Sequence, residues 1–230
     1  MPAMGLALTV AMAVAYAAFA HLASATHDDR YAYAALLALV AMMLAAGLVA
    51  RRAWAWVALP LALGACHLLY ASGHAGLPLL LVPVAFVAAI AWLFARSLWS
   101  PHGALITRIV AALDGSTPAT LAPDLLAYSR GLTAAWALVL GVLGLANLLL
   151  AMVAEPGGLL SSLGLRAPLT ITREQWSLFA NILNYGLVGG FFLVEFAYRK
   201  RRFPGRYSSF AAFLRQMAGL GPAFWRDFLR

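Results

Sequence analysis

The polar side chains with the clearest pattern lie in an apolar stretch near the C-terminal end of the chain. Asn181, Asn184 and Glu195 fall within an arc of about 60° if the stretch Trp176–Tyr198 forms one α-helix. Asn147, in the preceding apolar stretch, could face them. Intramembrane polar groups are costly and are candidates for function by default. A stripe of amides and a carboxylate could therefore line a path for protons or a small substrate.

The same residues also have a structural interpretation, which stays open. Arg199 follows Glu195 by one helical turn, in the order that favours an ion pair on a helix, and the two asparagines can bridge neighbouring helices. Because Glu195 lies close to the charged end of its stretch, we expect this ion pair to be exposed and to contribute less than about 1 kcal/mol.

Histidine and cysteine offer little catalytic geometry. The chain has one cysteine, Cys66, and the adjacent His67 points about 100° away around a helix, so the two cannot act as nucleophile and base. Its five histidines form no HxxxH or ExxH pair. We therefore expect no metal, no cofactor and no catalytic residue, and we keep His67 only as an intramembrane polar candidate.

The elements that position these residues are membrane-spanning helices. Of the 230 residues, 64% are hydrophobic and 10% are charged, whereas soluble domains carry about 25% charged residues. A run of about 20 apolar residues crosses a bilayer, and its backbone must satisfy its own hydrogen bonds as a helix. We therefore predict an all-α, six-helix transmembrane bundle. Its spans are Ala3–Ala23, Tyr31–Ala50, Ala53–Ser72, Gly76–Ala95, Gly131–Ala154 and Trp176–Tyr198.

Two further segments outside the spans are predicted to be helical. We expect a transmembrane domain of residues 1–198, which includes a cytoplasmic loop at 96–130, and a basic tail at 199–230. In the loop, the apolar spacing of Leu105–Leu113 predicts an amphipathic helix that Gly115 ends, and Pro123 begins the next helix. In the tail, Ser208 can cap a helix with an aromatic face that lies in the membrane interface.

The basic residues predict the orientation in the membrane. Thirteen of the 16 basic residues lie on one side: two after the second span, three in the loop at 96–130 and eight in the tail. The positive-inside rule therefore places both termini in the cytoplasm. A rival interpretation of the first span is a signal peptide cleaved near Ala25, but residues 1–5 contain no basic residue, which favours retention.

The tail is the most basic surface of the chain, whose formal net charge is +8. We do not expect a nucleic-acid partner, because loop arginines in a membrane protein record topology. One interpretation is contact with anionic lipid headgroups, and the other is docking of an acidic cytoplasmic protein. The residues concerned are Arg199, Lys200, Arg201, Arg202, Arg206, Arg215 and Arg226.

Four segments carry a resemblance to a known family. They are LPLLLVPVAFVAAIAWLFARSL, ITRIVAAL, LAYSRGLTAAWALVLGVLGLANLLLA and NYGLVGGFFLVEFAYRKRRF, which together cover about half of the chain. They resemble a family of proteobacterial inner-membrane proteins encoded among genes for aryl-polyene and xanthomonadin-type pigments. Members are sometimes labelled ketosynthase, but that enzyme needs a nucleophilic cysteine and two histidines in a soluble thiolase-like fold.

The resemblance implies a place in acyl-carrier-linked, fatty-acid-like biosynthesis at the bacterial inner membrane. Our leading hypothesis is a non-catalytic accessory or scaffold protein that anchors acyl carrier protein or pathway synthases. One alternative is a small transporter or lipid-handling protein that uses the polar stripe of the sixth span. A membrane enzyme acting on the acyl chain is a third.

Overall fold

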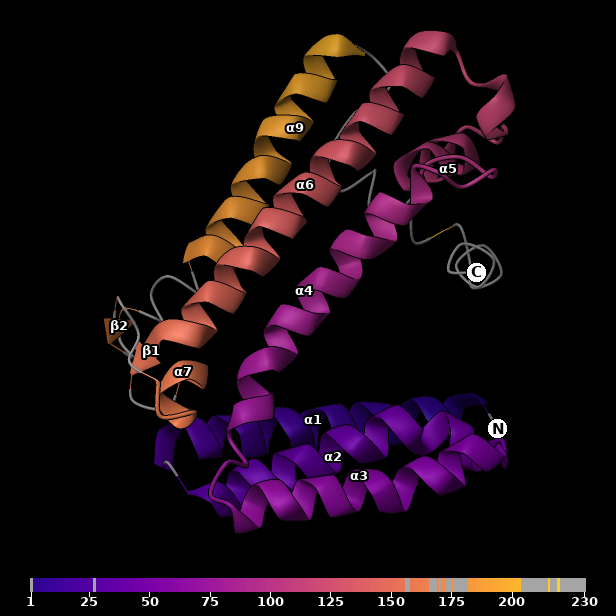
Figure 1. Cartoon of the computed structure of the whole chain (residues 1–230). Coiled ribbons are helices and arrows are strands. Elements are labelled where there is room, and N and C mark those ends of the chain that lie inside the picture. The colour runs from indigo at the N-terminus through magenta and orange to yellow at the C-terminus, as the bar shows by residue number, and fades with distance from the viewer. Residues whose placement is uncertain are drawn as a thin grey trace. The chain divides into compact units, whose positions relative to one another are not determined.

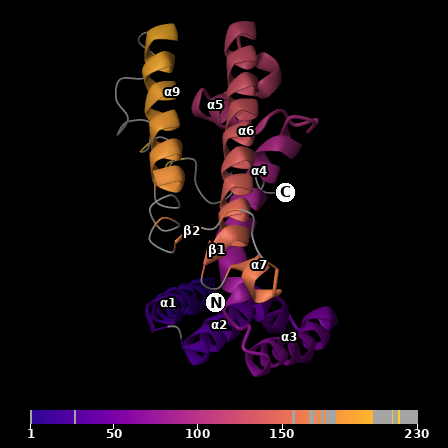
Figure 2. The same cartoon turned by 60° about the vertical axis from the view of Figure 1, so that its left-hand side comes forward.

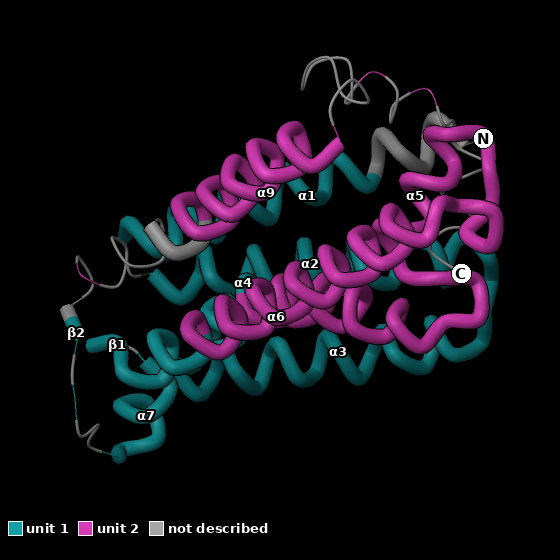
Figure 3. Tube along the Cα trace, turned by 90° about the horizontal axis from the view of Figure 1, so that it is seen from above, with its two compact units in different colours: residues 1–83, 148–173 teal, residues 84–147, 174–230 magenta. Residues whose placement is uncertain are grey.

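The computed structural model of this chain is built from helices (Figure 1), and its described part contains one pair of two-residue strands. It describes residues 2–26, 28–155, 158–165, 169, 171–172, 175, 182–203, 215 and 219. The chain divides into two compact units (Figure 3): unit 1 comprises residues 1–83 and 148–173, and unit 2 comprises residues 84–147 and 174–230. Helices α4 and α6 each contribute to both units.

Five described helices are long and apolar enough to cross a membrane. They match the first five predicted spans, so the chain is an all-α protein of multi-pass membrane character. The helices are α1 (Pro2–Thr26), α2 (Asp29–Val49), α3 (Ala53–Ala71), α4 (Leu77–Ser97) and α6 (Pro123–Val153). The sixth predicted span, Trp176–Tyr198, begins outside the described residues. Its described part is the π-helix η2 (Ile182–Leu187) followed by α9 (Val188–Arg202).

Unit 1 contains α1, α2 and α3, with α2 in contact with both of the others (Figures 1 and 2). Small side chains let these helices approach closely, as is typical of packing in lipid. A Cβ atom added to Gly47 of α2 would lie only 2.8 Å from the Cβ of Ala55 on α3. The rings of Tyr33 and Tyr70 stack with their centroids 4.9 Å apart. Steric fit of small and aromatic side chains therefore holds α2 against α3.

The rest of unit 1 connects the end of α6 to residues beyond it. Strand β1 (Ala154–Glu155) pairs in parallel with β2 (Ile171–Thr172), and the short helix α7 (Leu159–Ser162) lies between them in sequence. The ring atom Nε2 of His74, in the turn after α3, lies 3.4 Å from the carbonyl oxygen of Ser162. This contact joins the α3–α4 turn to α7 within the unit.

Unit 2 contains α5 (Leu105–Leu113), the short 3₁₀ helix η1 (Pro118–Thr120), η2, α9 and most of α4 and α6. The predicted helix over Leu105–Leu113 is confirmed, and α6 begins at Pro123 as predicted. The helix predicted from Pro123 and the fifth predicted span, from Gly131, form one continuous helix that runs from Pro123 to Val153. Its 31 residues extend about 46 Å, more than the roughly 30 Å of a hydrocarbon core.

Candidate functional site

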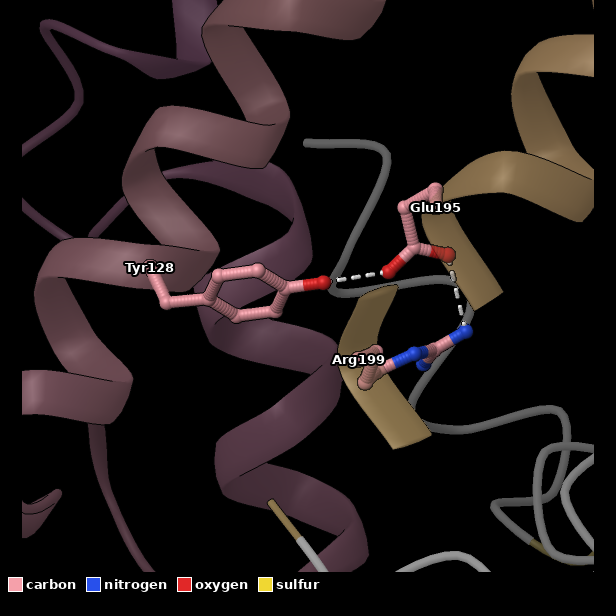
Figure 4. A network of polar contacts seen from close by, with 3 residues as sticks. All are labelled: Tyr128, Glu195 and Arg199. Carbon is pink, nitrogen blue, oxygen red and sulfur yellow. Dashed lines mark hydrogen bonds and ion pairs between the residues drawn. The ribbon is translucent and has the colours of Figure 1, made fainter. Parts of the chain in front are cut away.

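The candidate site is a polar network between α6 and α9 in unit 2 (Figure 4). The hydroxyl of Tyr128 on α6 donates a hydrogen bond to Glu195 Oε1 on α9 at 2.5 Å. Arg199 Nη2, one helical turn after Glu195, lies 3.0 Å from Glu195 Oε2. Each oxygen of the carboxylate therefore accepts from a different donor, one on each helix.

The ion pair expected between Glu195 and Arg199 is confirmed, but its predicted exposure is wrong. Both side chains are 6% exposed. The physical reason is that the first turns of α6 bring Tyr128 against α9, a contact between distant segments that a helix predicted from Pro123 does not by itself reveal. Removing one partner of a buried ion pair leaves the other charge uncompensated, at a cost of about 3–5 kcal/mol. The network is therefore a strong constraint on how α9 packs on α6.

Aromatic rings enclose this network. The ring of Tyr128 lies with its centroid 6.0 Å from that of Tyr198 and 5.2 Å from that of Phe203. The guanidinium carbon of Arg199 lies 5.6 Å from the centroid of the Phe196 ring, within the range of a cation–π contact. Apolar rings of this kind exclude water, which strengthens the hydrogen bonds and the ion pair that they surround.

A second polar cluster fixes α5 in the same unit. The first N–H groups of a helix have no partner within the helix, and Ala104 at the N-cap of α5 offers no side-chain acceptor. Ser97 Oγ, at the end of α4, accepts from Leu105 N at 3.0 Å. Thr133 Oγ1, on α6, accepts from Ile106 N at 3.2 Å. Side chains of two neighbouring helices thus cap the start of α5.

The cluster continues with a hydroxyl pair. Thr107 Oγ1 on α5 and Ser129 Oγ on α6 lie 2.8 Å apart, and both side chains are fully buried. Further along, the buried residues Val110 and Ala111 of α5 pack against Leu125 of α6. Helix α5 is therefore docked on α6 by hydroxyl bonds at its start and by apolar contacts at its end.

Sequence analysis did not identify Tyr128, Ser129 or Thr133. The signal was present in the spacing of α6, since Leu125, Ser129 and Thr133 recur every fourth residue and share one helix face. The structure confirms that this face is buried. The helix predicted from Pro123 already places Leu125, Ser129 and Thr133 on the same face.

Of the remaining polar candidates, the two whose side chains the structure describes are Asn147 and His67. Asn147 is buried on α6, where its Nδ2 donates to the carbonyl oxygen of Leu143 in the same helix at 3.0 Å. His67 is exposed on α3 and belongs to unit 1, whereas Cys66 beside it is buried, as their predicted divergence around the helix requires. Asn181 lies outside the described residues.

The predicted stripe of the sixth span assumed a regular α-helix, which the structure contradicts. Asn184 lies within the π-helix η2, whose backbone hydrogen bonds skip one more residue than those of an α-helix. The rotation per residue is therefore smaller than 100°, and the face shared by Asn184 and Glu195 cannot be derived from α-helical spacing. The side chain of Asn184 lies outside the described residues.

The basic residues next to the network are exposed. Lys200, Arg201 and Arg202 follow Arg199 directly at the end of α9 and are all exposed, as is Arg215 further along the tail. Arg206 and Arg226 lie outside the described residues, as does most of the predicted tail helix. Among the described residues, no three His, Cys, Asp or Glu side chains gather closely enough to hold a metal ion.

No family model, no curated protein and no solved structure matches this chain significantly. The resemblance to the pigment-cluster membrane family therefore stays a proposal that rests on the four sequence segments.

Proposed function

We propose that the chain is a six-span protein of the bacterial inner membrane with both termini in the cytoplasm. Continuous helix from Ile182 to Arg202 supports the sixth span, because these residues extend about 30 Å, the thickness of the hydrocarbon core. The four basic residues that end α9 support a cytoplasmic C-terminus. Reporter fusions at Arg230 and at Gly157 test this topology. They should report cytoplasm and periplasm respectively, and a periplasmic C-terminus contradicts it.

The function that the geometry supports best is a non-catalytic accessory or scaffold role. We propose that the protein holds an acidic acyl carrier protein, or a pathway synthase, at the membrane during aryl-polyene or xanthomonadin-type biosynthesis. The observation that carries this proposal is the engagement of both Glu195 oxygens by Tyr128 and Arg199. A carboxylate whose two oxygens are both bound by side chains of the same chain suits a fixed structural contact rather than a proton relay.

The same contact supports the display of positive charge. Phe203, directly after the exposed Lys200, Arg201 and Arg202, packs against the cluster that α5 and α6 form. The end of α9 is therefore held before its basic residues by the Tyr128–Glu195–Arg199 network and after them by Phe203, whose ring contacts that of Tyr128. A positive surface fixed in this way can steer and bind a negatively charged protein.

A specific observation favours a second candidate, a small transporter or lipid-handling protein. Short π-helical segments inside α-helices occur frequently at functional sites, and η2 contains Asn184 and the exposed Tyr185. In this alternative the unusual turn would open the polar stripe of the sixth span to a substrate. Asn184→Leu would then abolish pathway output, whereas the scaffold proposal predicts normal output.

Charge reversal of the tail tests the scaffold proposal. Arg206, Arg215 and Arg226 are changed together to Glu, and crosslinking to the acyl carrier protein and pigment output are measured in whole cells. Both should be lost while the protein remains inserted and abundant. The matched control changes Arg30, Arg166 and Arg173 to Glu, which alters the charge equally on the opposite predicted side. Crosslinking and output that persist in the tail variant contradict the proposal.

A further inference from the structure

The exposed face of α4 is apolar along most of the helix and carries a positive charge near its C-terminal end. Within unit 2, exposed residues recur at intervals of three and four along this helix, which places them on one face. The face begins with alanines and ends with Trp92, Arg96 and, in the turn after the helix, Trp99. The alanines are Ala85, Ala88 and Ala89. This stripe is therefore apolar along its length, with the exposed ring of Phe86 at its edge, and cationic at one end.

The two tryptophans at the C-terminal end of α4 are largely exposed. Trp92 is 66% exposed and Trp99 is 78% exposed, and Arg96 between them is exposed as well. Among the described residues, none forms an ion pair with Arg96. Its guanidinium is therefore open to a partner from outside the described part of the chain.

The depth of the C-terminal end of α4 in the membrane indicates which group pairs with Arg96. Helix α4 is 21 residues long, about 31 Å, so its last turn lies where the hydrocarbon gives way to headgroups. Tryptophan rings favour this layer, and a guanidinium pairs well with a phosphate through parallel N–H donors. A face exposed to lipid thus presents a phosphate-binding group at the depth of the phosphates.

We propose that Trp92, Arg96 and Trp99 form a headgroup site for an anionic phospholipid. Its phosphate pairs with Arg96 between the two rings, and one acyl chain lies along Ala85, Ala88 and Ala89. A second copy of the chain is a poorer occupant of the same face. A two-fold dimer with parallel chains presents the same patch on both subunits and brings two Arg96 side chains together, which is repulsive.

Native mass spectrometry tests this site on the full chain, purified with equal amounts of phosphatidylglycerol and phosphatidylcholine. Arg96→Gln should lower the retained phosphatidylglycerol, relative to phosphatidylcholine, by about fivefold, the fold-change that corresponds to the loss of about 1 kcal/mol from one guanidinium–phosphate contact. Arg96→Lys should restore most of it. The matched control is Arg130→Gln, since Arg130 is exposed on α6 with no tryptophan in the adjacent turns. It should retain lipid as the unchanged protein does.

Two results would overturn the proposal. Equal losses in Arg96→Gln and Arg130→Gln would mean that the lipid is attracted by net charge alone, with no site on α4. Unchanged lipid retention in Arg96→Gln, together with a dimer mass for the unchanged protein, would mean that a second copy covers this face. Topology reporters on each variant verify that the loss of one arginine leaves the orientation intact.

Discussion

Units 1 and 2 are stabilised by different kinds of contact. In unit 1, α2 meets α3 through small side chains, as at Gly47 and Ala55, and through the stacked rings of Tyr33 and Tyr70. In unit 2, buried hydroxyls cap α5, and a buried ion pair with a tyrosine joins α6 to α9. Steric fit dominates in the first unit and directional polar bonding in the second.

The distribution of charge follows the same division. Unit 2 contains eleven of the 16 basic residues and unit 1 contains five. Polar bonds fix the relative rotation and translation of helices more tightly than apolar contacts do, because hydrogen bonds weaken steeply with misalignment. The comparison indicates that the more precisely fixed unit is the one that presents the cations proposed to bind a partner.

The largest expected effect is on stability, and it distinguishes the buried arginine of α9 from an exposed one. Arg199→Leu leaves the buried Glu195 carboxylate without its cation and should lower the stability of unit 2 by about 3–5 kcal/mol. Arg201→Leu, two residues beyond Arg199 and exposed, removes the same charge at little cost. Thermal unfolding in detergent measures both. Equal melting temperatures for the two variants would show that the ion pair contributes nothing.

The next effect tests steric fit in unit 1. Gly47→Ala adds a Cβ atom 2.8 Å from that of Ala55 and should destabilise the protein by about 1–3 kcal/mol, the usual cost of overpacking. Gly64→Ala, on α3, is the control, because an added Cβ there meets nothing within 4 Å. It should be neutral or slightly stabilising. Equal responses of the two variants in thermal unfolding would remove the evidence for close packing of α2 on α3.

A smaller effect tests the hydroxyl capping of α5. Thr133→Val keeps the size of the side chain but removes the oxygen that accepts from Ile106 N, and should cost about 1 kcal/mol. Hydrogen exchange at the start of α5 should increase. Thr26→Val, at the exposed end of α1, serves as the control for the loss of a hydroxyl. Unchanged protection of α5 in Thr133→Val would mean that the hydroxyl does not hold the helix.

The sequence predicted the long helices well, because runs of apolar residues leave the backbone no alternative in lipid. The first four spans and the Leu105–Leu113 helix lie close to their expected positions. The start of α6 at Pro123 was predicted, but the contacts of Ser129 with α5 and of Tyr128 with α9 were not. Contacts between segments distant in sequence cannot be derived from spacing within one segment.

The candidate site was predicted in part. The Glu195–Arg199 pair follows from helical spacing alone, so it was found, but Tyr128 comes from another helix and was not. The π-helix at Asn184 was also missed, because its extra residue per turn leaves no mark in the residue types. Orientation, the sixth span, the lipid and carrier partners and the pigment pathway stay predictions.

The most direct test of the central claim, that Glu195 serves structure rather than chemistry, is pigment output per inserted molecule in Glu195→Gln. Our account predicts that thermal stability falls, because Arg199 and Tyr128 lose a charged acceptor, while output normalised to inserted protein is unchanged. Output that is abolished at normal stability and abundance would contradict it and identify Glu195 as a functional carboxylate.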